Sequence, residues 1–375
     1  MTLAREHAER FTGSFPRSTA DVETWHAKAQ PEQILDPSQP IFDPHHHLYG
    51  GVGDRNYYTP DDLKRDLASG HRIVGTAYIE AYGAGWRTTG PQELRTVGEV
   101  EAIVAQTSTP WALPHGACHV AAGVIAFADL LLGDQVVPVF EALAAAGKGR
   151  LRGIRYRTAV TSGPVGRSIV NPPARHLLVN PDFQRGVAQL ARHKLSFDAW
   201  VYDDQLAELT ALADACPDTV FILDHVGGLV GVAESSQELD ERRRRWISDL
   251  RTLAQRPNIM MKIGGLGMTM FGFGFEFLQA PPNSNQLAEA WREIFNISLD
   301  AFGAERCMFE SNFPVDAQCA SYATVWNAFK RLAQGLSDGE RRALFYGTAT
   351  KAYDLPAIAA LCDQISAEEP PRPII

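Results

Sequence analysis

From Ile41 onward, short apolar runs typical of β-strands alternate with stretches of helical periodicity, and this alternation constrains the fold more than any other feature. We expect eight strands, at Ile41–Asp43, Ile73–Glu80, Val120–Phe127, Leu151–Tyr156, Leu195–Val201, Val220–His225, Ile259–Ile263 and Cys307–Ser311. One intervening helix is expected over Asp134–Ala146, with a buried stripe of Val136, Phe140, Leu143 and Ala144. Eight strand–helix repeats favour an α/β protein whose parallel sheet closes into a (β/α)8 TIM barrel.

An open, doubly wound sheet is the alternative architecture. It commonly carries a glycine-rich nucleotide-binding turn, and neither G-x-G-x-x-G nor G-x-x-x-x-G-K-[ST] occurs at an early strand. We therefore expect one barrel domain over residues 41–355, preceded by an extension over 1–40 and followed by a tail over 356–375. The extension is polar, and Pro16, Pro31 and Pro40 break any long element, so no core is expected there.

Composition excludes several classes of partner. The chain has 35 Lys and Arg against 44 Asp and Glu, a net charge of −9, so binding to nucleic acid or to an anionic membrane is not expected. Five widely spaced cysteines suggest reduced, buried thiols. The N-terminus is charged and no run approaches a membrane span, so we expect a cytoplasmic protein with a small-molecule substrate. A homo-oligomer is left open.

Long connections follow three of the expected strands, over 158–179, 227–240 and 264–283. In a TIM barrel, such loops build the mouth of the active site. The third contains the segment Gly272–Phe277, in which glycine and phenylalanine alternate. It is interpreted either as a mobile aromatic lid or as a packed surface plug.

The sharpest local motif is Phe42-Asp43-Pro44-His45-His46-His47, at the end of the first strand. Alternation along a strand puts Asp43, His45 and His47 on one face and His46 on the other. Two imidazoles on one face at a strand end can bind one metal ion, whereas a pair of surface histidines is the alternative interpretation.

Two further strand ends carry candidate residues. Asp224 and His225 follow an apolar strand and precede two glycines, and His225 is expected to be a third imidazole at the mouth. On the last strand, Asn312 shares a face with Glu310, which is expected about 7 Å deeper. Asn312 either lines the mouth or caps the turn before Pro314.

Weaker candidates occupy the remaining strands. Arg155 can donate two hydrogen bonds to a carboxylate or lactone oxygen of a substrate, or it can pair with a neighbouring acid. Tyr156, the next residue, is a candidate for binding the substrate. Glu80 and Lys262 are strand-end charges that face the site or form internal ion pairs. The polar face of the fifth strand includes three candidates, Asp198, Trp200 and Tyr202.

In combination, these motifs resemble those of the amidohydrolase superfamily. The resembling motifs are Asp43-x-His45-x-His47, Gly153-Ile-Arg155, Leu223-Asp-His225, Lys262-Ile-Gly-Gly-Leu266 and Glu310-Ser-Asn-Phe-Pro314. The narrower likeness is to amidohydrolase-related family 2, which includes sugar-lactone and pyrone-dicarboxylate lactonases and, more distantly, decarboxylases. The resemblance implies one divalent metal, with zinc the expected ion, bound by His45, His47 and His225. The alternative that the resemblance implies, found in some lactonases of this branch, is that these histidines surround a substrate bound without metal.

The chain departs from this family pattern at Asn312, where the family usually has an aspartate. An amide cannot act as a base near neutral pH. The fifth strand also lacks the histidine that many superfamily members carry. His225 is therefore the first candidate for the general base, because an imidazole titrates near neutrality.

The sequence thus predicts a hydrolase of a small cyclic ester, or of a related carboxylic ester or amide. Water, activated by metal or positioned by histidine, would attack the carbonyl carbon. The expected catalytic residues are His225, Arg155, Asn312, Glu80 and Asp198. The expected substrate-binding residues are Arg155, Tyr156, Trp200, Tyr202 and Lys262. The alternatives are a metal-dependent non-oxidative decarboxylase and a degenerate barrel that binds a metabolite.

Overall fold

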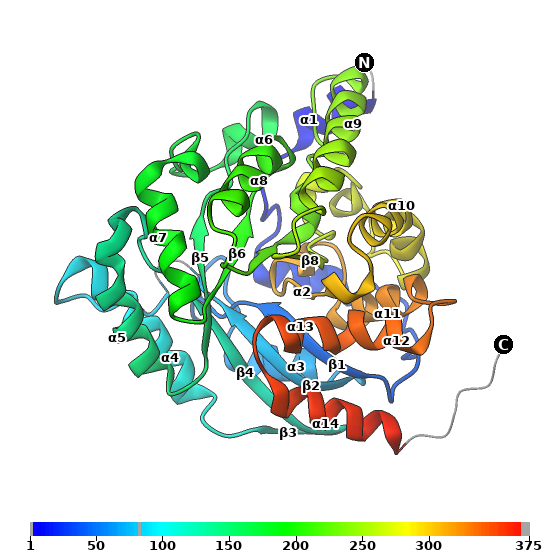
Figure 1. Ribbon diagram of the computed structural model, residues 1–375. Coiled ribbons are helices and arrows are strands. Elements are labelled where there is room, and N and C mark those ends of the chain that lie inside the picture. The colour runs from blue at the N-terminus through cyan, green and yellow to red at the C-terminus, as the bar shows by residue number, and fades with distance from the viewer. Residues whose placement is uncertain (1–2, 82–83, 369–375) are drawn as a thin grey trace.

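The computed structural model describes residues 3–81 and 84–368, and its centre is a barrel of eight parallel strands (Figure 1). The strand order is β1-β2-β4-β5-β6-β7-β8-β9, which follows the chain. The strands are β1 Pro40–His46, β2 Arg72–Ile79, β4 Gly116–Ala126, β5 Leu151–Arg157, β6 Ser196–Trp200, β7 Phe221–Leu223, β8 Ile259–Ile263 and β9 Cys307–Phe309. A short strand, β3 Trp111–Leu113, pairs antiparallel with β4. All eight expected strands are present, and the predicted TIM-barrel fold is confirmed.

The barrel closes between its last and first strands through the residues that follow β9. The backbone N–H of Asn312 donates to the carbonyl of His45 at 3.0 Å, and that of His47 donates to the carbonyl of Phe313 at 2.9 Å. An isolated parallel bridge joins His46 to Phe313. Closure therefore brings the motif of the first strand against the motif of the last.

Helices connect successive strands and cover the outside of the barrel. They are α3 Pro60–Leu67, α4 Val97–Gln106, α5 Val137–Gly147, α6 Gly163–Ser168, α7 Pro181–Arg192, α8 Leu206–Ala215, α9 Ser236–Leu253, α10 Ser284–Phe302, α11 Tyr322–Leu332, α12 Asp338–Arg342 and α13 Thr348–Ala352. The stripe predicted near α5 is correct for Val136, Phe140 and Leu143. It is wrong for Ala144, which is exposed, because the inward face is completed by Val139.

The segment Leu130–Gly147 is long and apolar enough to cross a membrane, which the sequence analysis did not anticipate. In this structure it forms the connection between β4 and β5, and 39% of it is buried. Gly133 has φ 57° and ψ −130°, so the segment is not one continuous helix. We therefore interpret it as part of the barrel wall.

The N-terminal extension contributes to the core, contrary to the prediction. It forms α1 Leu3–Arg10 and α2 Thr19–His26, and the Arg10 guanidinium of α1 lies 3.7 Å from the ring centre of Phe277. Val22 and Trp25 are buried, and the indole N–H of Trp25 donates to the carbonyl of Leu278 at 3.0 Å. Two apolar residues of a polar segment can be buried in this way because the barrel supplies the surface against which they pack.

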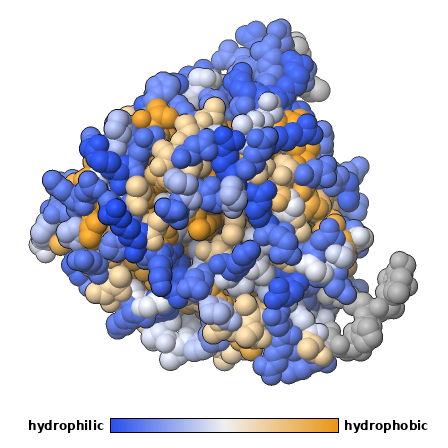
Figure 2. Space-filling model, in the orientation of Figure 1, coloured by the Kyte–Doolittle hydropathy of each residue, from blue (hydrophilic) through white to orange (hydrophobic). Residues whose placement is uncertain are grey.

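The segment after residue 355 begins with a helix, α14 Pro356–Ala367, which buries Ile358 and Cys362. The predicted tail is thus helical as far as the structure describes it, and residues 369–375 lie outside the described part. All five cysteines are free and buried, as predicted. Figure 2 shows a face that is mostly hydrophilic, with apolar residues in small separate groups.

Candidate active site at the mouth of the barrel

The two histidines at the end of β1 face each other inside the barrel. Their Nε2 atoms are 3.2 Å apart, and both side chains are buried. His46 turns away and contacts the hydroxyl of Thr76 at 2.8 Å, as alternation predicts. Alternation fails for Asp43, which accepts hydrogen bonds from Ser311 and Tyr322, because the β1–β2 register shifts after it.

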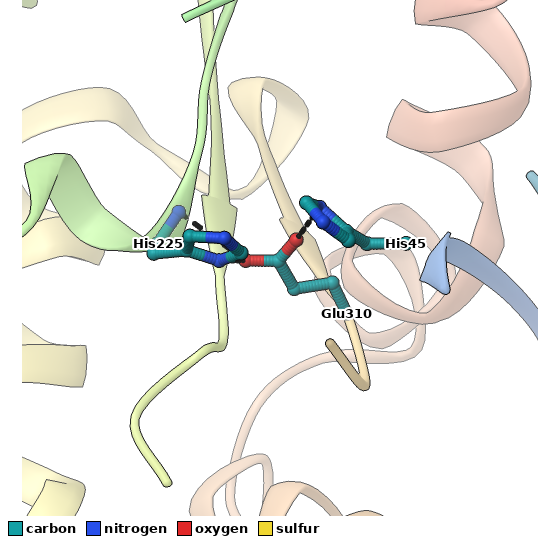
Figure 3. A group of neighbouring side chains, drawn as sticks. All are labelled: His45, His225 and Glu310. Carbon is teal, nitrogen blue, oxygen red and sulfur yellow. Dashed lines mark hydrogen bonds and ion pairs between the residues drawn. The ribbon is translucent and has the colours of Figure 1, made fainter. Parts of the chain in front are cut away.

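The carboxylate of Glu310 lies between two imidazoles (Figure 3). Its Oε2 is 2.7 Å from Nδ1 of His45, and its Oε1 is 2.6 Å from Nδ1 of His225. The backbone N–H of His225 also donates to Oε1, at 3.2 Å. Glu310, which the sequence places about 7 Å deeper than Asn312, thus contacts two of the three imidazoles directly.

These contacts determine which ring nitrogens remain as acceptors. A carboxylate accepts hydrogen bonds, so Nδ1 of His45 and Nδ1 of His225 carry protons. Nδ1 of His47 lies 2.9 Å from the carbonyl oxygen of Ile79 and donates to it. All three imidazoles thus present an unprotonated Nε2. Fixing the tautomer through the other ring nitrogen is the usual support for metal-binding histidines.

Arg155 reaches the same point from β5. Its Nε donates to Oε1 of Glu80 at 2.8 Å, its Nη2 donates to the Glu80 carbonyl at 2.7 Å, and its Nη1 lies 3.4 Å from Nε2 of His45. Asp224 Oδ2, buried at the end of β7, is 3.9 Å from Nη1 and has no hydrogen-bond donor among the described residues. The end of β5 therefore places a positive charge beside the imidazoles.

A second charged layer lies directly beneath. The ammonium group of Lys262 is 2.7 Å from Asp198 Oδ2, 2.9 Å from Asp224 Oδ1 and 3.2 Å from Nδ1 of His45. The hydroxyl of Tyr353 donates to Asp198 at 2.6 Å. Lys262 and Asp198 have no exposed surface, so the structure places both beneath the imidazoles and away from solvent.

The electrostatics of the site favour a bound cation. Burial, reinforced by Lys262, lowers the pKa of His45 well below its usual value, and burial with Arg155 does the same for the pKa of His47. Burial raises the pKa of Glu310, but its contacts with His225 and His45 outweigh burial and bring it to about 2.

Among residues 3–81 and 84–368, four carboxylates at the site are paired with two side-chain cations. The acids are Glu80, Asp198, Asp224 and Glu310, and the cations are Arg155 and Lys262. His45, His225 and Glu310 also offer ligand atoms within 4.8 Å of one another. An excess of two buried negative charges beside three unprotonated Nε2 atoms fits a divalent metal ion.

The predicted aromatic residues divide between two locations. The ring of Trp200 is 4.8 Å from that of His225, and Tyr202 lies 5.3 Å from Trp200, so both belong to the mouth. Tyr156 instead packs between Phe127 and Phe183, the latter on α7, which places it on the helix-facing side of β5. The structure does not bring Tyr156 to the imidazoles.

Asn312 points toward another acid instead of the imidazoles. Its Nδ2 donates to Asp316 Oδ1 at 2.8 Å, and the N–H of Gly267 donates to Asp316 Oδ2 at 2.9 Å. Burial raises the pKa of Asp316 to about 7, and these two hydrogen bonds only partly oppose the rise. Asn312 has a left-handed backbone, with φ 55°, a conformation that asparagine tolerates better than most residues.

Sequence reasoning missed three features of the site. The contacts of Glu310 with the imidazoles were not foreseen, Asp224 was given no role, and Tyr353 was not considered. Asp224 directly precedes His225 at a strand end and was detectable from that position. Tyr353 lies after the last strand, and no local signal connects it with Asp198.

A family model described as amidohydrolase matches residues 42–355. The chain belongs to the amidohydrolase family. This confirms the resemblance noted in the sequence, and the functional class of an enzyme in this superfamily follows from it.

Two curated relatives and two solved structures show how far the likeness extends. Protein y4mH of Sinorhizobium fredii, whose activity is uncharacterised, is 32% identical over 325 residues, 84% of this chain and 98% of that protein. The L-fucono-1,5-lactonase of Burkholderia multivorans is 34% identical over 186 residues, 48% of this chain and 59% of that enzyme. An amidohydrolase from Burkholderia multivorans, crystallised with HEPES, has a TM-score of 0.62 at 25% identity, covering 84% of this chain and 99% of its own. A zinc-bound crystal structure of the amidohydrolase from that organism has a TM-score of 0.61 at 24% identity, with the same coverage.

The close approach of Gly265 to His225 yields a first prediction. A Cβ atom at Gly265 would lie 2.5 Å from Nδ1 of His225, and the glycine has φ 64°. We expect Gly265→Ala to push the ring away from Glu310 and to reduce the catalytic rate at least about 10²-fold. Gly303→Ala is the matched control, because Gly303 has φ 72° but no atom within 4 Å of the added Cβ. Equal activity in the two variants would contradict the proposed contact.

The Asn312–Asp316 hydrogen bond yields a second prediction. Asn312→Asp would place two buried carboxylates together, and we expect a loss of about 2 kcal/mol in the free energy of unfolding at pH 8. The loss should shrink as the pH falls below about 7, because the pair then holds a proton. The double variant Asn312→Asp/Asp316→Asn, which reverses donor and acceptor, should recover most of the loss. Urea unfolding at pH 8 and pH 5 measures these differences.

Proposed function

We propose that the chain hydrolyses a small cyclic ester by attack of water on the ring carbonyl. The observation that supports this most strongly is the pair of His45 and His47 Nε2 atoms, 3.2 Å apart, with Arg155 Nη1 3.4 Å from the first of them and the ring of His225 4.6 Å from that of His45. This arrangement combines a place to activate water with a fixed positive charge for the oxyanion. The lactonase among the curated relatives supports the choice of ester.

A divalent metal, for which zinc is our proposal, would be held by His45, His47 and His225. When bound it would polarise the ester carbonyl and acidify the attacking water. A structural relative that carries zinc supports this choice of metal. The remaining contributions come from the side chains of the chain itself.

Glu310 keeps the imidazoles in the reactive tautomer. Because its two oxygens accept from Nδ1 of His45 and of His225, neither ring can turn its Nε2 away without losing a buried charge-assisted hydrogen bond. In a metal-free site, the same pairing leaves His225 Nε2 as the group positioned to accept the proton of the attacking water. Glu310 would then stabilise the imidazolium that forms.

Arg155 orients the substrate. Glu80 holds two of its three nitrogens, so the Nη1 atom is directed toward the imidazoles with little freedom. A lactone carbonyl oxygen placed there would gain negative charge in the transition state opposite a guanidinium that does not need to move. Trp200 packs against His225 and excludes water from one side of the ring.

The direct test is acid release from a panel of sugar, pyrone and alkyl lactones at fixed pH. We expect at least one five- or six-membered lactone to be opened, and Arg155→Met to reduce kcat at least about 10²-fold. Arg152→Met is the control, because Arg152 lies on the same strand and its Nη1 donates to the carbonyl of Leu151 instead. If no member of the panel releases acid, the assignment to lactones is wrong.

Removal of metal provides a separate prediction. We expect the purified protein to contain about one equivalent of a divalent metal, and chelation to lower lactone hydrolysis at least about 10²-fold until zinc is restored. His47→Asn should lower the metal content without unfolding the protein. Full activity of metal-free protein would instead assign the reaction to the His225–Glu310 pair.

A further inference from the structure

Residues 11–18, here called the mouth strap, cross the open end of the barrel between α1 and α2. The strap is tied to the loops after three different strands. Gly13 accepts a hydrogen bond from Thr269 Oγ1 at 2.9 Å, after β8, and Phe15 accepts one from Arg55 at 3.2 Å, after β1. Arg17 pairs twice with Gln318, after β9, through bonds of 3.1 and 2.9 Å.

These bonds join the strap to the rim of the mouth as a fixed wall. Arg17 also donates to the carbonyl of Glu276 at 2.5 Å, and its guanidinium lies 4.0 Å from the ring centre of Trp25. The Gly272–Phe277 segment therefore contacts the N-terminal extension. The Thr19 hydroxyl, just after the strap, donates to the carbonyl of Tyr57 at 3.1 Å.

A cavity of about 340 Å³ lies between the strap and the barrel. Phe11 and Phe15 of the strap line it together with Trp200, Tyr202 and other residues of the mouth. The volume falls within the range of small-molecule sites. Because Trp200 also contacts the ring of His225, at 4.8 Å, the cavity adjoins the candidate active site.

The chemistry of the lining indicates what the cavity accepts. Four aromatic side chains, two from the strap and two from the end of β6, offer flat apolar faces suited to another ring. Ser14, Asn171 and Arg157 add polar groups, which suit a hydroxyl or carbonyl substituent, and the Arg157 guanidinium also donates to the carbonyl of Val170.

We infer that this cavity binds an aromatic ring carried by the substrate beyond its ester bond, and that Phe11 and Phe15 determine this specificity. The inference rests on the proposed lactone hydrolysis and deepens it. The family match begins at residue 42, so the strap lies outside the matched domain. The selectivity is accordingly supplied by an addition to the barrel, while the reacting groups belong to the barrel itself.

Two pairs of probes separate binding from turnover. Dihydrocoumarin carries a benzene ring fused to its lactone, and δ-valerolactone lacks that ring. The ketones 2-tetralone and cyclohexanone reproduce the two shapes but have no ester bond to hydrolyse. We expect the wild-type protein to bind 2-tetralone at least about tenfold more tightly than cyclohexanone in calorimetric titration, and Phe15→Ala to remove that difference.

Turnover should respond in the same direction. In Phe15→Ala we expect KM for dihydrocoumarin to rise about tenfold with kcat within about twofold, and KM for δ-valerolactone to change little. Phe15→Tyr retains a ring and should behave as wild type. Phe273→Ala is the matched control, because Phe273 stacks on Phe271 and Phe275 and does not line the cavity. If Phe15→Ala does not fold, Phe11→Ala serves the same test.

The outcomes distinguish this inference from the proposed function. Selective binding of 2-tetralone that depends on Phe15, with no acid released from these two lactones or from any member of the panel above, would overturn the proposed function and support the aromatic subsite. Hydrolysis with no preference for the fused ring, or an equal loss of affinity in Phe273→Ala, would overturn the subsite.

Discussion

The pairing of one carboxylate with two imidazoles organises this barrel. Glu310 is fully buried, and an unpaired carboxylate there would be costly, so the donors that satisfy it must be held accurately. His45 and His225 supply those donors from β1 and from the turn after β7, at 2.7 and 2.6 Å. Gly265 approaches the His225 ring so closely that only a residue without a side chain fits. The tautomers, the orientation of the rings and the glycines of the β8 loop all follow from this pairing.

A layered arrangement of charge supports the pairing from below. Lys262 neutralises part of the negative charge of Asp198 and Asp224, and Tyr353 donates to Asp198. Burial lowers the pKa of Lys262, but the adjacent carboxylates outweigh burial and raise it above its ordinary value, so the ammonium stays charged. The layer therefore acts as a fixed electrostatic base for the imidazoles. The remaining excess of negative charge lies at the mouth, where a divalent cation would neutralise it.

Much of the fold was predictable because its signals are local. Eight apolar runs of strand length recur between helical segments, and a parallel sheet buried on both faces requires such runs. The imidazoles at the strand ends were predictable for the same reason, since the carboxyl ends of parallel strands meet at one face. The errors concern contacts made between distant segments. Ala144 is exposed because Val139 completes the inward face of α5, and Trp25 is buried because the β8 loop covers it.

The sequence by itself determined the barrel, the order of its motifs and the presence of three histidines and Arg155 at one end. Only the tertiary structure decided which nitrogen of each ring is available, because that depends on the carboxylate or carbonyl each ring meets across the barrel. It also decided the environment of Asn312, whose side chain turns to Asp316, and the place of residues 11–18 above Trp200. Periodicity reports which face of an element is buried, whereas hydrogen-bond partners more than 250 residues apart, such as Thr269 and Gly13, are determined only by closure of the whole chain.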